Sequence, residues 1–374
     1  MPHYSSYDSF KTKKSMDKKR RAKEKAFGNQ QNNTEDKFIV RKANNPGTVI
    51  EVRYNDAYVL YKDEVVVAKL RKGINAVCNK ILFPGDKVVI SDGENGNYTI
   101  DNLVKRKSLL TRVHKDSTRS NDIGTEKGIA ANVDTAVIVV AAKEPPLHSK
   151  FIDRYLMILQ NSNIPSIICL NKSDLATKEE EQILDIYRKL NIPVVETSTL
   201  NKTGIEELKK CLKGKQTIFV GNSGVGKSSL TNALMDVDEI KTSHVSRKSK
   251  RGRHTTTTSK YYVWDDDSSI IDTPGIRSLD VSDIKQQEVQ NYFQEFQGWA
   301  DKCKFSNCLH YKEPEKLCMV KQGVKAGAIS SDRYASYVKI LQNVLNEKKV
   351  EHNEDISNRE AKQEEKDESD EREI

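Results

Sequence analysis

The chain has 374 residues, 31% of which are charged, and a formal net charge of +8 at pH 7. This length allows two or three domains that each bury a core. The sequence lacks both an apolar run of the roughly 18 residues that a membrane span needs and the N-terminal apolar stretch of a secretory signal. We therefore expect a soluble, cytoplasmic protein with no membrane contact, whose six cysteines are reduced.

The charge is distributed unevenly along the chain. Residues 1–42 contain 12 Lys or Arg against 5 Asp or Glu, and residues 351–374 contain 4 against 11. Neither segment shows apolar periodicity, so we expect a basic disordered arm and an acidic disordered tail. The residues between them carry the remaining +8. A basic body with a basic arm favours a polyanionic partner, although a merely soluble surface also explains the charge of the body.

Residues 43–105 are predicted to form a small barrel. Gly, Asn and Asp turns separate short β-like runs at 48–52, 57–61, 64–70, 87–90 and 98–100. About five short strands fit a barrel of the OB type, a fold that commonly binds nucleic acid. A plain β-barrel used for protein contact fits these residues almost equally well.

Residues 106–281 alternate between apolar strands and helices. The run 135–142 is fully apolar, as in a parallel strand that is buried on both faces, and helices are predicted over 151–160 and 178–190. This alternation predicts an α/β domain with a doubly wound parallel sheet. The loops at the carboxyl ends of its strands would form the ligand site.

An N-K-x-D pattern, Asn171-Lys172-Ser173-Asp174, follows an apolar strand of this domain. The Asp174 carboxylate can accept hydrogen bonds from both N1–H and the exocyclic amine of guanine, and adenine lacks that amine. The Asn171 amide suits the N7/O6 edge of guanine, and the stem of Lys172 can cover the ring. Ser198 lies where GTPases place a loop that contacts the guanine oxygen, although an ordinary turn at a strand end explains it nearly as well.

The segment 221–228 matches the phosphate-loop pattern G-x-x-x-x-G-K-[ST] between a short apolar strand and a helix. In this pattern backbone N–H groups surround the phosphates, Lys227 reaches the β- and γ-phosphates, and the Ser228 hydroxyl binds Mg²⁺. We expect GTP or GDP to contact the end of the strand, the loop and the start of the helix: Val220, Gly221, Asn222, Ser223, Gly224, Val225, Gly226, Lys227, Ser228 and Ser229.

A D-x-P-G motif at 272–275 ends the next apolar strand. Asp272 is expected to hold Mg²⁺ through water, and the Gly275 N–H to sense the γ-phosphate. Four threonines lie between the phosphate loop and this motif, at 255–258. One of them could complete the Mg²⁺ shell, and Thr256 is our candidate.

GTPases of the Ras type follow D-x-x-G with a glutamine that orients the attacking water. Ile276 occupies that place here and cannot hydrogen-bond a water. His254, beside the threonines, can orient a water or accept its proton, although a solvated loop histidine would have the same spacing. The alternative is slow hydrolysis that a partner triggers.

The order of these motifs is unusual. In ordinary GTPases the phosphate loop comes first, whereas here the N-K-x-D motif and the guanine loop precede it, so the set is complete but circularly permuted. In this order the chain closely resembles the RsgA/YjeQ family of ribosome small-subunit-dependent GTPases over roughly residues 45–340. The resemblance also rests on residues 129–134, 152–156 and 252–257 and on a cysteine cluster.

This resemblance implies a GTP phosphohydrolase that the small ribosomal subunit stimulates. It further implies binding to that subunit and its rRNA during late maturation, with hydrolysis timing release, and an OB-type barrel at the N-terminus. The family assigns its catalytic histidine to the Gly-Arg-His-Thr-Thr-Thr motif, which here contains His254. We expect a monomer.

The cluster Cys303-x₄-Cys308-x-His310-x₇-Cys318 gathers three thiols and one imidazole into sixteen residues. This is the Cys₃His ligand set of a closed structural zinc site, and unligated structural thiols are the alternative. The resemblance strengthens the zinc prediction. Two residues more than the family's usual spacing precede Cys318, and a longer loop can still close because closure depends weakly on length.

The predicted fold is multidomain, with an N-terminal OB-type β-barrel, a central α/β circularly permuted P-loop GTPase domain and a C-terminal helical zinc-binding domain. The expected segments are the arm 1–42, the barrel 43–105, the GTPase domain 106–281, the zinc domain 282–350 and the tail 351–374. One competing interpretation is a slow GTP-dependent RNA-binding module. Another is a permuted GTPase that acts on the large subunit or on another RNA.

Overall fold

The computed structural model describes residues 39–53, 56–71, 82–93, 96–114, 125–235, 260–265, 267–272 and 284–346. The chain divides into two compact units, the first formed by Met1–Leu82 with Asp86–Arg106 and the second by Phe83–Gly85 with Lys107–Ile374. Within the described ranges, none of the helices is long and apolar enough to cross a membrane.

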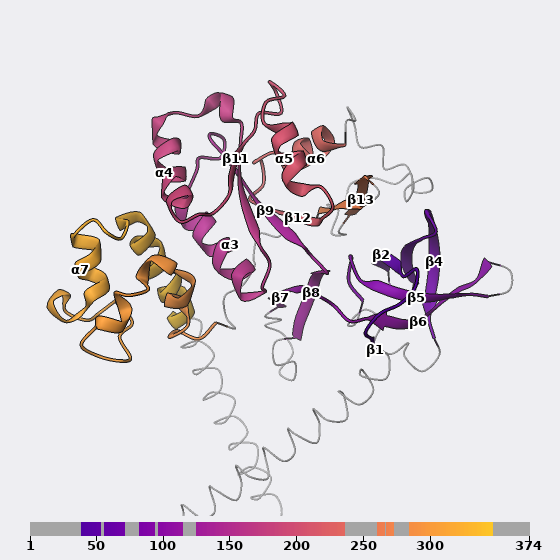
Figure 1. Ribbon diagram of the computed structural model, residues 1–374, viewed down its shortest axis with the longest axis horizontal. Helices are drawn as coiled ribbons and strands as arrows, with labels where there is room; N and C mark the ends of the chain where they lie inside the picture. Colours follow the sequence, from indigo (N-terminus) through magenta and orange to yellow (C-terminus); the bar gives the residue numbers. More distant parts are fainter. Residues whose placement is uncertain are drawn as a thin grey trace, which may run out of the picture. The chain divides into compact units, whose positions relative to one another are not determined.

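The first unit is a five-stranded barrel, drawn in indigo and purple in Figure 1. Its strands are β2 (Gly47–Arg53), β3 (Asp56–Tyr61), β4 (Glu64–Leu70), β5 (Lys87–Asp92) and β6 (Tyr98–Val104). Neighbours pair in the closed order β2-β3-β4-β6-β5-β2, in which only β4 and β6 run parallel. The short β1 (Ile39–Val40) extends β6. The predicted barrel of five strands is confirmed.

The barrel closes around a small apolar core because its strands alternate between inward and outward side chains. In β4, for example, Val66, Ala68 and Leu70 are buried whereas the residues between them are exposed. Val59 and Ile100 are fully buried in the same cluster. Buried and exposed residues therefore alternate along the barrel wall.

The second unit contains a six-stranded sheet. Its order is β11 (Val194–Glu196), β10 (Ser166–Asn171), β9 (Thr135–Ala141), β12 (Gln216–Val220), β14 (Ser268–Asp272) and β13 (Lys260–Asp265). The pairs from β11 to β14 are parallel, and β13 is antiparallel at the edge. A separate hairpin joins β7 (Leu109–His114) to β8 (Thr125–Ala131). The predicted parallel sheet is confirmed.

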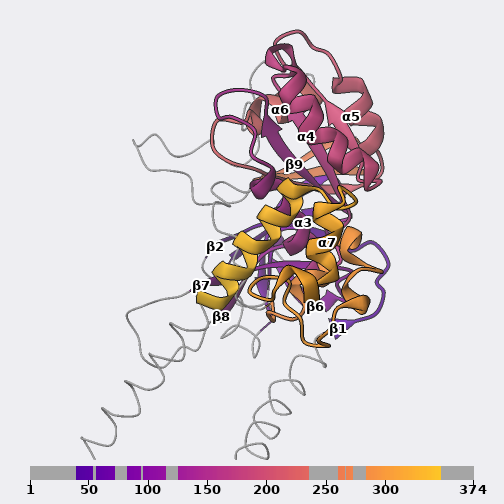
Figure 2. The same ribbon diagram turned by 90° about the vertical axis from the view of Figure 1, so that its left-hand side faces the viewer.

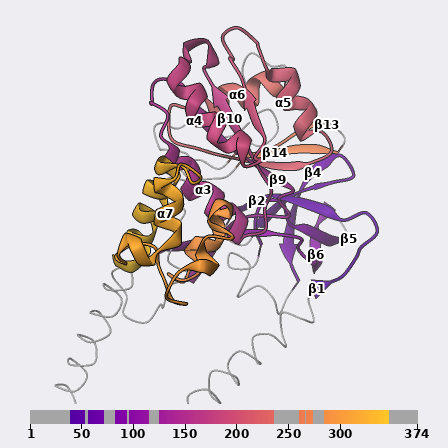
Figure 3. The ribbon, with the colours of Figure 1, turned by 60° about the vertical axis from the view of Figure 1, so that its left-hand side comes forward.

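Helices cover both faces of this sheet, as Figures 1 and 3 show. All seven residues of β9 are buried. Ile138 and its even-numbered neighbours join the apolar cluster that contains α3 (Ser149–Asn161) and α4 (Lys178–Lys189). Val139 and its odd-numbered neighbours join the cluster that contains α5 (Ile205–Leu212) and α6 (Lys227–Leu234). Burial on both faces explains why β9 is apolar from Ala136 to Ala141.

The start of α4 shows how local sequence fixes a helix. Thr177 caps the helix by accepting a hydrogen bond from the Glu179 N–H, and the Glu180 side chain accepts one from the Thr177 N–H at 2.8 Å. This capping box pairs two N–H groups that helix geometry leaves without partners. Glu180 also accepts a bond of 2.9 Å from Lys143 in the loop after β9.

The C-terminal region of the second unit combines short turns with two helices in its described residues, and is drawn in orange and yellow in Figure 2. They are the 3₁₀ turns η4 (Val289–Tyr292), η5 (Gln294–Phe296), η6 (Ala300–Lys302) and η7 (Glu315–Leu317), the helix α7 (Met319–Lys325), and a helix at 331–346. The predicted helical region is thus correct only in part. Between 289 and 318 the chain makes short turns around the cysteine cluster, and longer helices form only after Cys318.

Candidate functional site

The topology of the sheet predicts a ligand site at the carboxyl end of β12. From β9 the chain builds β10 and β11 on one side, and then crosses to β12 on the other side of β9. In doubly wound sheets, ligands bind at the carboxyl ends of the strands where the order reverses in this way. The phosphate loop 221–226 leaves β12 at this point and leads directly into α6.

Two glycines let the phosphate loop pack tightly against its surroundings. Gly226 precedes α6 with a φ of 93°, and a Cβ there would lie 2.2 Å from the Asn171 amide nitrogen. A Cβ on Gly221 would lie 2.4 Å from the main-chain oxygen of Val139. Both contacts are too short for any side chain. Val225 is buried, whereas residues 222–224 and Ser228 are exposed, so the exposed side of the loop is open to a ligand.

Lys227 lies across this loop. Its Nζ donates to the main-chain oxygens of Gly221 at 2.7 Å and Asn222 at 2.8 Å. Two main-chain oxygens therefore hold the ammonium group against the backbone of the phosphate loop.

Asn171 connects the N-K-x-D motif to the phosphate loop. Its side chain is buried, and Nδ2 donates to the main-chain oxygen of Val225 at 2.9 Å. Its Oδ1 accepts from the hydroxyl of the buried Thr197 at 3.3 Å. These two partners fix the orientation of the amide. The sequence assigned Asn171 only to the guanine edge, and its bond to the phosphate loop could not be found from spacing.

Asp174 and Ser198 lie close together at the carboxyl edge of the sheet, where they follow β10 and β11. The buried Ser198 hydroxyl donates to Oδ1 of the exposed Asp174, and the Asn201 N–H donates to the Ser198 oxygen at 3.1 Å. The main chain of Ser198 also pairs with Thr203. The hydroxyl therefore positions the carboxylate.

A loop at 142–147 completes this edge of the site, and sequence reasoning did not single it out. Lys172 adopts a left-handed backbone with φ of 57°, and its Nζ donates to the main-chain oxygen of Glu144 at 2.5 Å. Pro145 lies 3.7 Å from where a Cβ on Gly224 would be. The loop thus bonds the N-K-x-D motif and lies close to the phosphate loop. Its signal in the sequence was the Pro145-Pro146 pair directly after a buried strand.

Asp272 ends β14 in register with Phe219 of β12. It therefore lies at the carboxyl edge of the sheet. Tyr262 lies nearby, and burial with a smaller contribution from Asp272 raises the pKa of Tyr262 to about 12. The other expected members of this part of the site, Thr256 and Gly275, and the candidate catalytic His254, lie outside the described residues.

The four predicted metal ligands lie together in the C-terminal region. The ligand atoms of Cys303, Cys308, His310 and Cys318 are all within 4.8 Å of one another. His310 Nδ1 is 3.6 Å from the Cys303 sulfur and 3.4 Å from the Cys318 sulfur. Cys318 is therefore part of the cluster despite its longer spacing. Three thiols and one imidazole fit a tetrahedral metal such as zinc.

A second set of contacts orients His310. Gln290 Oε1 lies 2.7 Å from His310 Nε2, while the Gln290 amide nitrogen donates to the Gln287 oxygen at 3.1 Å. This amide orientation places the proton on Nε2 and leaves Nδ1 as an acceptor facing the thiols, which is the tautomer that binds metal. Burial lowers the pKa of His310 and raises the pKa of Cys308 to about 12. Gln290 had no signal in the sequence.

Two family models match overlapping parts of this chain. The family model described as RsgA GTPase matches residues 103–282, and one described as 50S ribosome-binding GTPase matches residues 216–361. Two similar relatives come from Thermotoga petrophila and Alkaliphilus metalliredigens, and both are named small ribosomal subunit biogenesis GTPase RsgA. The first is 38% identical, and the match covers 80% of this chain and 97% of the relative. The second is 34% identical, and the match covers 72% of this chain and 88% of the relative.

Two solved structures have a similar fold. The crystal structure of YjeQ from Thermotoga maritima has a TM-score of 0.63 and 34% identity, and covers 80% of this chain and 98% of its own. The crystal structure of YloQ, described as a circularly permuted GTPase, has a TM-score of 0.60 and 26% identity, with coverages of 82% and 99%. The permuted motif order, the site at the carboxyl edge of the sheet and these relatives lead to one conclusion. The chain belongs to the RsgA family of circularly permuted GTPases.

Proposed function

We propose that this GTPase binds the small ribosomal subunit and its rRNA, assists late maturation of that subunit, and is released when GTP is hydrolysed. The observation that carries the proposal is the hydrogen bond between Asn171 and Val225, which joins base recognition and phosphate binding in one site. The names of the relatives supply the subunit. The net charge of +8 supports a polyanionic partner.

Guanine selection is assigned to the N-K-x-D motif. Asp174 accepts from N1–H and the exocyclic amine, with its carboxylate held by Ser198. Lys172 covers the ring with its stem while its ammonium group bonds the Glu144 oxygen. Asn171 has a second amide proton beyond the one that Val225 accepts, which could reach the N7/O6 edge.

Phosphate binding is assigned to the loop 221–228 and to the start of α6 at Ser229. The N–H groups of the exposed loop surround the phosphates, and Lys227 would exchange its two carbonyl partners for phosphate oxygens. Mg²⁺, which enters with the nucleotide, would be held by Ser228 and Thr256, with Asp272 acting through water. When bound, the ion neutralises charge that develops on the phosphate oxygens.

Hydrolysis is assigned to His254, which would orient the attacking water in place of the glutamine of Ras-type enzymes. Gly275 would sense the γ-phosphate through its N–H. The Cys₃His cluster would hold one structural zinc ion, because its ligand set leaves no coordination position for a water.

The direct test is GTP hydrolysis with and without purified small subunits. We expect stimulation by small subunits, and co-sedimentation with them in a non-hydrolysable GTP analogue but not in GDP. Lys227→Ala and Ser228→Ala should each abolish turnover because they remove a phosphate contact and a Mg²⁺ ligand. Normal hydrolysis by either variant would show that the phosphate loop is not the catalytic site.

The large subunit is the second candidate partner, because the model that matches residues 216–361 is described as a 50S ribosome-binding GTPase. That match begins at Gln216, the first residue of the strand that precedes the phosphate loop. The match therefore starts with the strand that leads into the phosphate loop. Residues that bind the nucleotide do not specify a ribosomal subunit. Parallel assays with large subunits decide between the two, and stimulation by large subunits alone would overturn our proposal.

A further inference from the structure

Asp153 and Arg333 form a buried ion pair inside the second unit. Arg333 Nη1 donates to Asp153 Oδ1 at 2.5 Å, and the two side chains are only 4% and 0% exposed. Asp153 belongs to α3, whereas Arg333 lies 180 residues later in the helix 331–346. The pair therefore connects the nucleotide-binding part of the unit to the C-terminal region with the cysteine cluster.

Other side chains extend this network. Glu295 accepts from Arg333 Nε at 2.6 Å and from Nη2 at 3.1 Å. The Tyr187 hydroxyl of α4 lies 2.7 Å from Asp153 Oδ1 and 3.1 Å from the Ser149 oxygen. The guanidinium group also lies 4.4 Å above the ring of Phe293. All three guanidinium nitrogens thus have carboxylate partners with defined directions.

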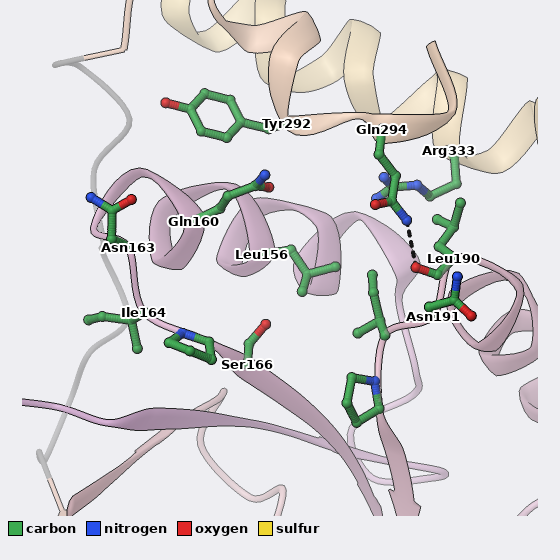
Figure 4. Close-up of a pocket in the computed structure, with 13 residues that line it drawn as sticks. Leu156, Gln160, Asn163, Ile164, Ser166, Leu190, Asn191, Tyr292, Gln294 and Arg333 are labelled. Carbon is green, nitrogen blue, oxygen red and sulfur yellow. Dashed lines mark hydrogen bonds between the residues drawn. The ribbon is translucent and has the colours of Figure 1, made fainter. Parts of the chain in front are cut away.

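These charges lie beside a cavity at the amino ends of β10 and β11. The cavity has a volume of about 410 Å³, and its lining includes Leu156, Ser166, Tyr292 and Arg333 (Figure 4). Next to it, Gln294 donates to the Leu190 oxygen at 2.6 Å. Side chains therefore fill the contact between α3 and the C-terminal region only in part. The charged network supplies the hydrogen bonds of this contact, and these bonds have defined directions.

The N-terminal end of the same helix, close to Asp153, lies beside the nucleotide site. α3 begins at Ser149, directly after the loop 142–147 that bonds Lys172 and approaches Gly224. Asp153 is one helical turn beyond Ser149, and an α-helix transmits a displacement along its axis with little bending. A shift of the C-terminal region that moves Arg333 would therefore move this loop.

We propose that Asp153 and Arg333 are positioning residues for GTP hydrolysis. The network fixes the position of α3 against the C-terminal region. A partner that binds this region therefore sets the position of loop 142–147 beside the nucleotide. Buried ion pairs add little to stability compared with apolar side chains, but their directionality can fix a single arrangement. The inference rests on the proposed function because it names how the ribosomal partner reaches the catalytic site.

The test replaces the three charges together by Asp153→Leu, Glu295→Leu and Arg333→Met. Removing one partner alone would leave a buried charge unpaired and unfold the region, whereas an apolar set keeps it packed. Thermal unfolding and metal content should stay at wild-type values and verify the fold. The matched control removes the exposed pair Glu315 and Lys325 of the same region, 51% and 75% exposed, by the same kinds of substitution.

Two measurements then decide the proposal. The ratio of subunit-stimulated to unstimulated hydrolysis should fall about tenfold in the triple variant and stay unchanged in the control, a loss of the size that coupling energies produce. Without any subunit, amide hydrogen exchange at residues 142–144 and 147 should be at least about threefold faster in the triple variant.

The outcomes separate this inference from the proposed function. If the wild-type protein is not stimulated by small subunits, the proposed function fails and hydrogen exchange alone decides the inference. A folded triple variant whose loop exchanges at the wild-type rate would overturn the positioning role. Full stimulation of the triple variant, by small subunits that also stimulate the wild-type protein, would overturn this role as well.

Discussion

The side-chain amide of Asn171 donates to the main-chain oxygen of Val225 at 2.9 Å, although 54 residues separate them. This bond unites two motifs that the permuted chain places in reverse order. Because Asn171 ends β10 and Val225 follows β12, the distance between the motifs depends on the strands of one sheet. The permutation changes the connections between these strands and leaves the site intact.

Replacing Asn171 should loosen the phosphate loop. Asn171→Asp places a carboxylate against the Val225 carbonyl and the Thr197 hydroxyl, whereas Asn171→Ala leaves the buried carbonyl without its donor. An unsatisfied buried group costs about 1–3 kcal/mol, so we expect GTP and GDP to bind roughly five- to 150-fold more weakly. Titration with fluorescent nucleotides measures this. Wild-type affinity in both variants would contradict the role of this bond.

Asp174→Asn should change the base preference from guanine to xanthine. The substitution replaces one acceptor oxygen by a donor, and xanthine has a carbonyl where guanine has its exocyclic amine. We expect weaker binding of GTP and a gain for XTP in competition titrations. Ser198→Ala should weaken GTP binding without any gain for XTP, because it removes only the hydroxyl that holds the carboxylate. Unchanged GTP affinity in Asp174→Asn would refute the assignment.

The carboxylate of Glu180 predicts a stability difference that depends on pH. Hydrogen bonds from Lys143 and then Thr177 lower the pKa of Glu180 to about 2. A lowered carboxylate pKa stabilises the fold above the unfolded value and loses this effect as pH falls through the folded value. Glu180→Gln should therefore cost about 1 kcal/mol at pH 7, and the difference should disappear between about pH 4.5 and pH 2. Urea unfolding of both proteins across this range checks it, and a difference that persists at pH 2 would point to another cause.

Metal analysis of protein purified without added zinc should find about one zinc ion per chain. Cys308→Ser should lose the ion and destabilise the C-terminal region, while nucleotide binding by the sheet persists. Cys211→Ser is the matched control, since Cys211 lies in α5 away from the cluster and should keep the metal. Gln290→Leu should weaken zinc binding about tenfold or more because it removes the orienting partner of His310. A metal-free but folded wild-type preparation would exclude a structural zinc site.

His254→Ala should separate catalysis from binding. If His254 positions water only in the transition state, kcat and kcat/KM should fall together by about 10²–10⁴-fold while GTP affinity stays nearly unchanged. Single-turnover hydrolysis with saturating small subunits, beside fluorescence titration of nucleotide, measures both. A loss below about threefold would leave His254 as an ordinary loop residue. An equal loss of GTP binding would instead indicate a role in folding.

The sequence by itself determined the local parts of this protein. The phosphate loop, the N-K-x-D motif and the D-x-P-G motif each keep fixed spacings, because a loop that surrounds phosphates or a base needs particular backbone turns. The strands of the barrel and sheet were visible for a similar reason, since burial on one face or both leaves a period in the apolar residues. The metal ligands were also predictable, because their side chains identify the chemistry.

Only the tertiary structure decided which distant residues meet. Asn171 with Val225, Glu180 with Lys143, His310 with Gln290, and Asp153 with Arg333 are pairs that no spacing reveals. Each pair joins two separate elements of the fold. The geometry of the pair therefore depends on how the helices pack on the sheet and on where the C-terminal turns end. The same packing replaced the first part of the predicted helical region by short 3₁₀ segments, because the chain between 289 and 318 must bend repeatedly to bring four ligands within 4.8 Å.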